Sequence, residues 1–218
     1  MSKSIKRKSV LGPVIMVLVL AGIWSPTAAA NPVGVIVNLF GQVEIRTGGG
    51  GSWQPAQLHQ QLLAGDLIQT GPASGVAILC ADESQIKLNE NTSLELREVA
   101  VSDRLRFSEI IPAAFSQAAA SLYRVNHGEV WLRNKNDKFR FELETPAVTA
   151  AIRGTEFNLR VTQEGVSLLT LLEGSVHFGN PWGELVLVAG EEGLARPGQA
   201  PTKRVILNPA DAVQWALY

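Results

Sequence analysis

Residues 139–161, "FRFELETPAVTAAIRGTEFNLRV", show most clearly what kind of fold this chain adopts. Residues 139–143 and 155–161 each alternate apolar and polar side chains. A period of two is typical of a β-strand with one buried face. The turn-forming pair Thr145 and Pro146 lies between the two runs. The stretch therefore predicts strands separated by turns.

Similar runs recur along the rest of the chain, with turn residues between them at intervals of roughly 8–12 residues, and helical periodicity is rare. We predict one all-β domain over residues 31–207, built of wound, solenoid-like or roll-like sheet layers. A β-sandwich or jelly roll is the alternative. Residues 108–124 are rich in alanine and could form a short helical surface insertion. Residues 208–218 form a C-terminal tail that could begin a helix.

A faint repeat supports the wound arrangement. Glycine, a polar residue and valine enter a strand three times, in "GQVEI" from Gly41, "GEVWL" from Gly128 and "GSVHF" from Gly174. Glycine at these points lets the chain turn before a strand re-enters the sheet. The spacing is irregular, so the repeat predicts layers wound from similar units rather than a regular solenoid. "RTGGGGSW", residues 46–53, predicts a hairpin loop.

The first thirty residues have the layout of a secretory signal. A basic head precedes an apolar run over residues 10–24, which is shorter than the roughly 20 residues that span a bilayer as a helix. Small residues follow, and we expect cleavage after Ala30. The rest of the chain, residues 31–218, called the body below, is then periplasmic or extracellular. The alternative is an uncleaved segment that anchors the exported body, and no cysteine ends the run to carry a lipid.

The composition of the body narrows its partners. Without the signal segment, 15 basic residues remain against 20 acidic ones, a net charge of −5. An acidic body argues against nucleic acid and anionic membrane surfaces as partners, because both need a basic face. Cys80 is the only cysteine, so an internal disulfide cannot form. Its strand-forming neighbours predict a buried, inert thiol.

Known catalytic motifs are missing from the sequence, and we predict that the protein is not an enzyme. His59, His127 and His177 lie far apart, so neither a metal site nor a cofactor is expected. Glu142 and Glu144 share the polar face of one predicted strand. This arrangement is more typical of a solvated strand flank than of a catalytic carboxylate pair.

Short motifs follow one another in a characteristic order. They are Gly41 with Val43, Trp53, Leu63, Gly65-Asp66, Ile68, Thr70-Gly71, Ala77 and Leu94, then Thr145-Pro146, Arg153-Gly154-Thr155, Phe157, and Glu173-Gly174 followed by Val176. In this order they make residues 36–200 resemble the FecR-type domain of exported bacterial proteins, known from iron-uptake signalling. The resemblance implies an envelope module that works through protein contacts, in signalling or assembly. It also implies structural or partner-contact roles for Gly65, Asp66, Thr145, Pro146, Arg153, Gly154, Thr155, Phe157, Glu173 and Gly174.

Two features depart from the iron-signalling members of the family. Only eight or nine residues precede the apolar run, too few for the cytoplasmic region that binds a sigma factor. The receptor-contacting C-terminal region also has no counterpart. We therefore do not carry over the sigma-regulator role whole. Residues 198–218 are similar to a subgroup in which this domain precedes tetratricopeptide repeats, so we expect a stand-alone version or a piece of a longer protein.

Arg153 has two interpretations, because it stands between apolar residues and Gly154. Its guanidinium could pin one turn to the next by pairing with Glu173, Asp66 or Glu156. Alternatively, "IRGTEF" could form part of a contact surface for a partner. The first interpretation is favoured.

The tryptophans keep a second function open. Trp53 and Trp182 are flanked by glycine or proline in predicted turns and could be exposed, whereas Trp131 alternates within a strand and is predicted to lie in the core. Exposed aromatics would favour a module that binds or supports cell-wall or surface polymer. The sequence does not name a partner for either function.

Overall fold

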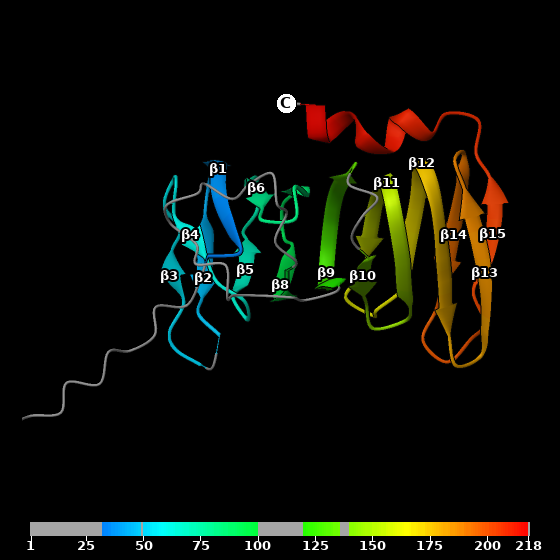
Figure 1. Ribbon diagram of the computed structural model, residues 1–218, viewed down its shortest axis with the longest axis horizontal. Coiled ribbons are helices and arrows are strands. Elements are labelled where there is room, and N and C mark those ends of the chain that lie inside the picture. The colour runs from blue at the N-terminus through cyan, green and yellow to red at the C-terminus, as the bar shows by residue number, and fades with distance from the viewer. Residues whose placement is uncertain (1–31, 49, 100–119, 136–139, 218) are drawn as a thin grey trace, which may run out of the picture.

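The computed structural model describes residues 32–48, 50–99, 120–135 and 140–217. The predicted signal peptide, residues 1–30, lies outside this part. Fifteen strands and one 3₁₀ helix form the described chain (Figure 1). In order they are β1 (Gly34–Phe40), β2 (Val43–Arg46), β3 (Gln54–Pro55), β4 (Gln61–Leu62), β5 (Leu67–Thr70), β6 (Gly75–Cys80), β7 (Gln85–Leu88), β8 (Ser93–Glu98), β9 (Ala120–Asn134), β10 (Arg140–Glu144), β11 (Thr149–Val161), β12 (Ser167–Asn180), β13 (Gly183–Val188), β14 (Glu191–Ala195), β15 (Thr202–Val205) and η2 (Pro209–Leu217).

Three long strands each belong to two sheets. The first half of β9 lies between β8 and β10, whereas its second half lies between β7 and β11. β11 and β12 likewise change neighbours near their midpoints. All fifteen strands thus form one continuous hydrogen-bonded sheet that folds into two layers. The layer called sheet A runs β3-β2-β5-β8-β9-β10-β11-β12-β13, and the layer called sheet B runs β4-β1-β6-β7-β9-β11-β12-β14-β15. The chain winds repeatedly from one sheet to the other, which confirms the predicted all-β fold of wound layers.

Glycines mark the points where the chain changes sheets. Gly128, Gly154 and Gly174 have φ of 102°, 58° and 90° and lie at the midpoints of β9, β11 and β12. Gly41, with φ of 71°, lies between β1 in sheet B and β2 in sheet A. Residues with a Cβ rarely adopt these angles. All three glycines of the faint repeat in the sequence thus lie at corners between the layers.

The core fills the space between the two sheets. The ring centroids of Tyr123 and Phe141 in sheet A are 4.8 Å apart, and Phe141 lies 6.4 Å from Phe157 in sheet B. All three side chains are buried, within one continuous apolar cluster. The alternating runs of the sequence therefore bury one face of each sheet against the other.

The predicted helical insertion over residues 108–124 is wrong at its C-terminal end. Residues 120–124 begin β9 and pair with both β8 and β10. Ser121 and Tyr123 alternate into the core there, so strand pairing and burial override the helical preference of the alanines. Residues 108–119 lie outside the described residues.

Cys80 is buried, as predicted, beside Asp82 and Tyr123. The Asp82 carboxylate is itself buried and accepts hydrogen bonds from the Tyr123 hydroxyl at 3.0 Å, from the Ser121 hydroxyl at 2.5 Å and from the Ser84 amide at 2.9 Å. Burial, reinforced by the nearby Asp82 charge, raises the pKa of the Cys80 thiol well above its ordinary value. Burial likewise raises the pKa of the Tyr123 phenol.

These shifts predict a loss of stability at alkaline pH. In the unfolded chain Cys80 and Tyr123 lose their protons above their ordinary pKa values of about 9.0 and 10.0, while the folded chain keeps them. The free energy of unfolding should then fall by about 1.4 kcal/mol per pH unit for each group. Urea unfolding between neutral and alkaline pH measures the slope. Cys80→Ala and Tyr123→Phe should each remove one contribution, and a slope unchanged in the double variant would contradict the assignment.

Candidate functional site

The outer face of sheet B carries the C-terminal helix. Val213 and Ala216 of η2 pack with Trp131 of β9, and Leu172 and Trp215 border this small cluster. η2 leads from β15 back toward the first half of the chain (Figure 1), and its contacts are with β7, β9, β11 and β12. Trp131 is therefore buried, as predicted, but it lies beneath η2 rather than between the sheets.

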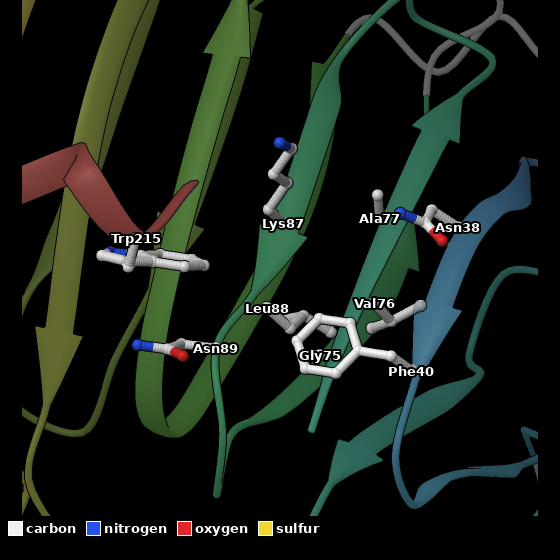
Figure 2. A pocket seen from close by; sticks show the side chains of 9 residues that line it. All are labelled: Asn38, Phe40, Gly75, Val76, Ala77, Lys87, Leu88, Asn89 and Trp215. Atoms are coloured by element: carbon white, nitrogen blue, oxygen red, sulfur yellow. The ribbon is translucent and has the colours of Figure 1, made fainter. Parts of the chain in front are cut away.

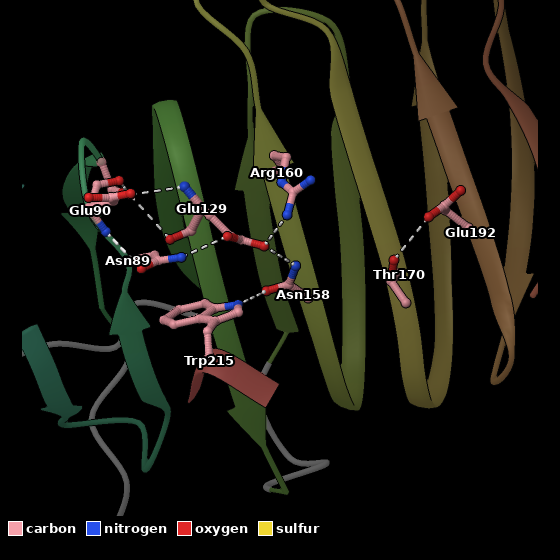
Figure 3. A network of polar contacts seen from close by, with 9 residues as sticks. Asn89, Glu90, Glu129, Asn158, Arg160, Thr170, Glu192 and Trp215 are labelled. Atoms are coloured by element: carbon pink, nitrogen blue, oxygen red, sulfur yellow. Dashed lines mark hydrogen bonds and ion pairs between the residues drawn. The ribbon is translucent and has the colours of Figure 1, made fainter. Parts of the chain in front are cut away.

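A polar network lies under η2 on the same face (Figure 3). The Glu129 carboxylate accepts hydrogen bonds from the side-chain amides of Asn89 at 2.8 Å and Asn158 at 2.9 Å, and pairs with the Arg160 guanidinium at 3.0 Å. Asn158 in turn accepts a hydrogen bond from the Trp215 indole at 3.2 Å. The network thereby fixes the position of Trp215 relative to strands β7, β9 and β11.

An apolar groove of about 150 Å³ opens beside Trp215 (Figure 2). Trp215 stands on one side of it and Phe40 of β1 on the other, with Lys87 of β7 between them. The Phe40 ring is 58% exposed and lies over Gly75, where a Cβ would come within 2.7 Å of it. Leu88 contributes to the floor.

The Lys87 ammonium links the groove to the helix. It donates a hydrogen bond to the Ala216 carbonyl near the end of η2 and lies 5.9 Å from the centroid of the Trp131 ring. Two further hollows lie on the outer face of sheet B, one beside Glu129 and Arg160, the other between Leu168 and Arg204. This face therefore offers several concave places for contact.

The Gly65-Asp66 motif shapes a turn of sheet A. The Asp66 carboxylate is buried and accepts hydrogen bonds from the amides of Leu63 at 2.8 Å and Gly48 at 3.2 Å. The Gly65 amide donates to the Leu96 carbonyl at 2.6 Å. Asp66 thus ties the loop between β2 and β3 to the turn between β4 and β5.

Thr145 closes the turn between β10 and β11. Its hydroxyl oxygen accepts hydrogen bonds from the amides of Ala147 at 3.2 Å and Val148 at 3.0 Å, and from the Ser167 hydroxyl at 2.8 Å. Pro146 follows in the same turn. Such side-chain bonds stabilise tight turns in place of ladder bonds.

The remaining motif residues meet where β11 and β12 change sheets. A Cβ at Gly174 would lie 2.5 Å from the Gly154 carbonyl oxygen. Thr155 is buried, and its hydroxyl has no partner among the described residues. Phe157 is part of the core, and Glu173 is exposed. The backbones of β11 and β12 are therefore in close contact at this corner. The corner is distant in sequence from the turn of Asp66.

Arg153 pairs through its backbone with Ser175 of β12, and its side chain lies outside the described part. Two of its three proposed partners are engaged elsewhere: Asp66 binds backbone amides, and Glu156 accepts a hydrogen bond from the Trp131 indole at 3.2 Å. The interpretation of Arg153 as a structural ion pair stays a prediction.

The two turn tryptophans differ in exposure. Trp182, in the β12–β13 turn, is 58% exposed, whereas Trp53 is half-buried with the Arg46 guanidinium 5.1 Å from its ring centroid. The strands next to them, β3 and β13, lie at opposite ends of the molecule (Figure 1). They do not form one aromatic platform.

Among the described residues, no group of three histidine, cysteine or carboxylate side chains could hold a metal ion. Of the two acidic residues on the polar face of β10, Glu144 forms an ion pair with the Arg97 guanidinium at 2.9 Å. In the same part of the chain, no helix has the length and apolar character needed to cross a bilayer.

Sequence reasoning missed the residues that build the sheet B face, namely Phe40, Lys87, Glu129, Asn158 and Trp215. Glu129 is the second residue of the "GEVWL" repeat, directly after Gly128. Glu129 and Trp131 are two residues apart and therefore share one face of a strand. This spacing was the sequence signal for a second, outward-facing cluster. Nothing local indicated that η2 would cover that face.

Comparison with known proteins agrees with this architecture. Residues 66–177, about half of the 218-residue chain, match the FecR protein family. The chain therefore belongs to the FecR family. No curated protein shows significant similarity to it.

Two crystal structures of a candidate anti-sigma factor from Parabacteroides distasonis ATCC 8503, at 1.65 Å and 2.50 Å resolution, share the fold. Each superposes with a TM-score of 0.52 at 16% sequence identity and aligns with 69% of this chain. The alignment spans 62% of the Parabacteroides chain.

Proposed function

We propose that this protein is an exported, non-enzymatic interaction module that takes part in envelope signalling or protein assembly. Membership of the FecR family supports a role related to signalling. The structural neighbours, described as a candidate anti-sigma factor, agree with such a role. The proposed location beyond the membrane follows from the signal-like first thirty residues.

The observation that carries this proposal is the groove on sheet B. Phe40 is a large aromatic side chain held more than half exposed beside Trp215, above an apolar floor. Exposed aromatics beside a pocket are typical of protein contact sites, where such residues contribute most of the binding energy. We propose that a partner protein inserts an apolar side chain between Phe40 and Trp215.

Phe40→Ala should abolish partner binding while lowering the free energy of unfolding by no more than about 2 kcal/mol, because more than half of the residue is already exposed. A photo-reactive residue at position 40 in the native host, followed by mass spectrometry, identifies the partner. The affinity of purified wild-type and variant chains for it is then compared by calorimetry. Trp182→Ala is the matched control, because Trp182 is equally exposed but far from the groove.

Two results would contradict the proposal. One is equal loss of binding in both variants, and the other is cross-linking at position 40 to no protein. Retention of the chain on insoluble wall material, lost in Trp182→Ala, would instead support the second candidate function, a module for cell-wall or surface polymer. Of the two tryptophans predicted to be exposed, Trp182 has the exposed side chain that this role needs, whereas Trp53 is half-buried.

A further inference from the structure

Among the strands of the described residues, four lie at the edges of the two sheets, and three of these edges are protected. β3 and β4 contain only two residues each. Two side chains of sheet B cap the backbone of β13. The Lys203 ammonium donates a hydrogen bond to the Val186 carbonyl at 2.9 Å, and the Glu191 carboxylate accepts one from the Val188 amide at 3.0 Å. Short edges and side-chain caps prevent unwanted strand pairing.

The fourth edge, β15, has four residues, with Lys203 and Arg204 among them, but no side chain of the described residues caps its outward backbone groups. All four of its residues are exposed, Val205 at 76%, and so is Leu207, two residues beyond the strand, at 97%. The Ile206 amide donates to Gly190, next to β14, at 2.9 Å. Backbone groups alternate in direction along an antiparallel strand, so the amides and carbonyls of Lys203 and Val205 point away from β14.

We propose that β15 receives an extended, acidic segment of a partner protein as an additional strand of sheet B. This inference rests on the proposed interaction function and adds the place and chemistry of the contact. A row of alternating backbone donors and acceptors is satisfied by another extended strand. The exposed side chains of Val205 and Leu207 supply apolar contacts for it.

The positive charge around β15 indicates an acidic partner segment. Residues 193–210 contain Arg196, Lys203 and Arg204 but no acidic residue, although the body as a whole is acidic. Lys203 and Arg204 pair with Glu191 and Glu192 of β14, but in each pair the cation is the exposed partner, at 40% and 71% against 14% and 9% for the glutamates. Pairing of β15 with a second copy of itself would place these cations opposite one another, which is unfavourable. An acidic segment avoids this repulsion.

The test uses the outward amide of Val205. Proline is tolerated in an edge strand where its nitrogen faces solvent, so Val205→Pro should keep the fold but remove a donor to the incoming strand. Val205→Thr is the control that keeps the amide. With a photo-reactive residue at position 207 in the native host, we expect a cross-link to an acidic segment that falls about tenfold or more in Val205→Pro and persists in Val205→Thr.

Register provides a second measurement that does not depend on the proline variant. Photo-reactive residues at positions 205 and 207 should cross-link to partner positions about two residues apart, as in paired strands. The inference is overturned if the cross-link survives Val205→Pro, maps to another copy of this chain, or shows no two-residue step. If position 40 captures a partner and position 207 does not, the inference fails while the proposed function stands. If neither position captures a protein, both fail.

Discussion

Gly128→Ala is expected to destabilise the protein by roughly 3–5 kcal/mol, enough to unfold a domain of ordinary stability. Gly128 has φ of 102°, and a Cβ there would lie 2.3 Å from the Cα of Thr92. Neither the corner of β9 nor the backbone of Thr92 can move without breaking the pairing of β8 with β9. Thermal or urea unfolding of the purified variant measures the effect.

Gly190→Ala separates the two causes. Gly190 has a similarly unfavourable φ of 87°, but nothing lies within 4 Å of the position that a Cβ would occupy. Its substitution should cost only the backbone strain, roughly 1–2 kcal/mol. Equal losses of stability in the two variants would show that close packing at the corner of β9 is unimportant.

Glu129→Ala is expected to destabilise the protein by roughly 2–4 kcal/mol. The substitution leaves the side-chain amides of Asn89 and Asn158 without their acceptor, and releases the Arg160 guanidinium. The loss should not exceed this range, because the Arg160 side chain is 60% exposed and water can replace part of its pairing with Glu129. Trp215 should also lose its fixed position, so its fluorescence should change along with the unfolding midpoint.

A surface glutamate serves as the control for this substitution. Glu184 is exposed on β13, and Glu184→Ala should change the free energy of unfolding by less than about 0.5 kcal/mol. Glu129→Gln should fall between wild type and alanine, because one of its oxygens can still accept a hydrogen bond. A stability equal to wild type in Glu129→Ala would mean that the network does not support the sheet B face.

The local sequence was sufficient to predict strands and corners. Alternation in residues 139–143 and 155–161 predicted strands that the structure contains, because a period of two follows directly from strand geometry. The glycines of "GEVWL" and "GSVHF" marked turns into strands, because only glycine adopts the required φ without strain. The alanine-rich run before Tyr123 misled, because alanine has a helical preference that strand pairing overrode.

The functional face could not be predicted in the same way. Phe40, Lys87 and Trp215 come from segments separated by up to 175 positions in the numbering, and each looks ordinary in its own segment. The sequence motifs that marked the family, such as Gly65-Asp66 and Thr145-Pro146, instead bind the backbone at turns. Family motifs of this kind report the fold, because every member needs the same corners.

The sequence by itself determined the all-β class, the buried state of Cys80, the wound layers and the family of this protein. The strands, the corners and each single family motif depend on residues close together in the chain, whose geometry is set by alternation, by turn chemistry and by the backbone freedom of glycine, and the family follows from the order of these motifs. Tertiary structure alone decided that β9, β11 and β12 serve both layers, that η2 lies on sheet B beside an open groove, and that β15 is an exposed edge of sheet B. These features depend on contacts between distant segments, and no local pattern encodes which distant strand will be a neighbour.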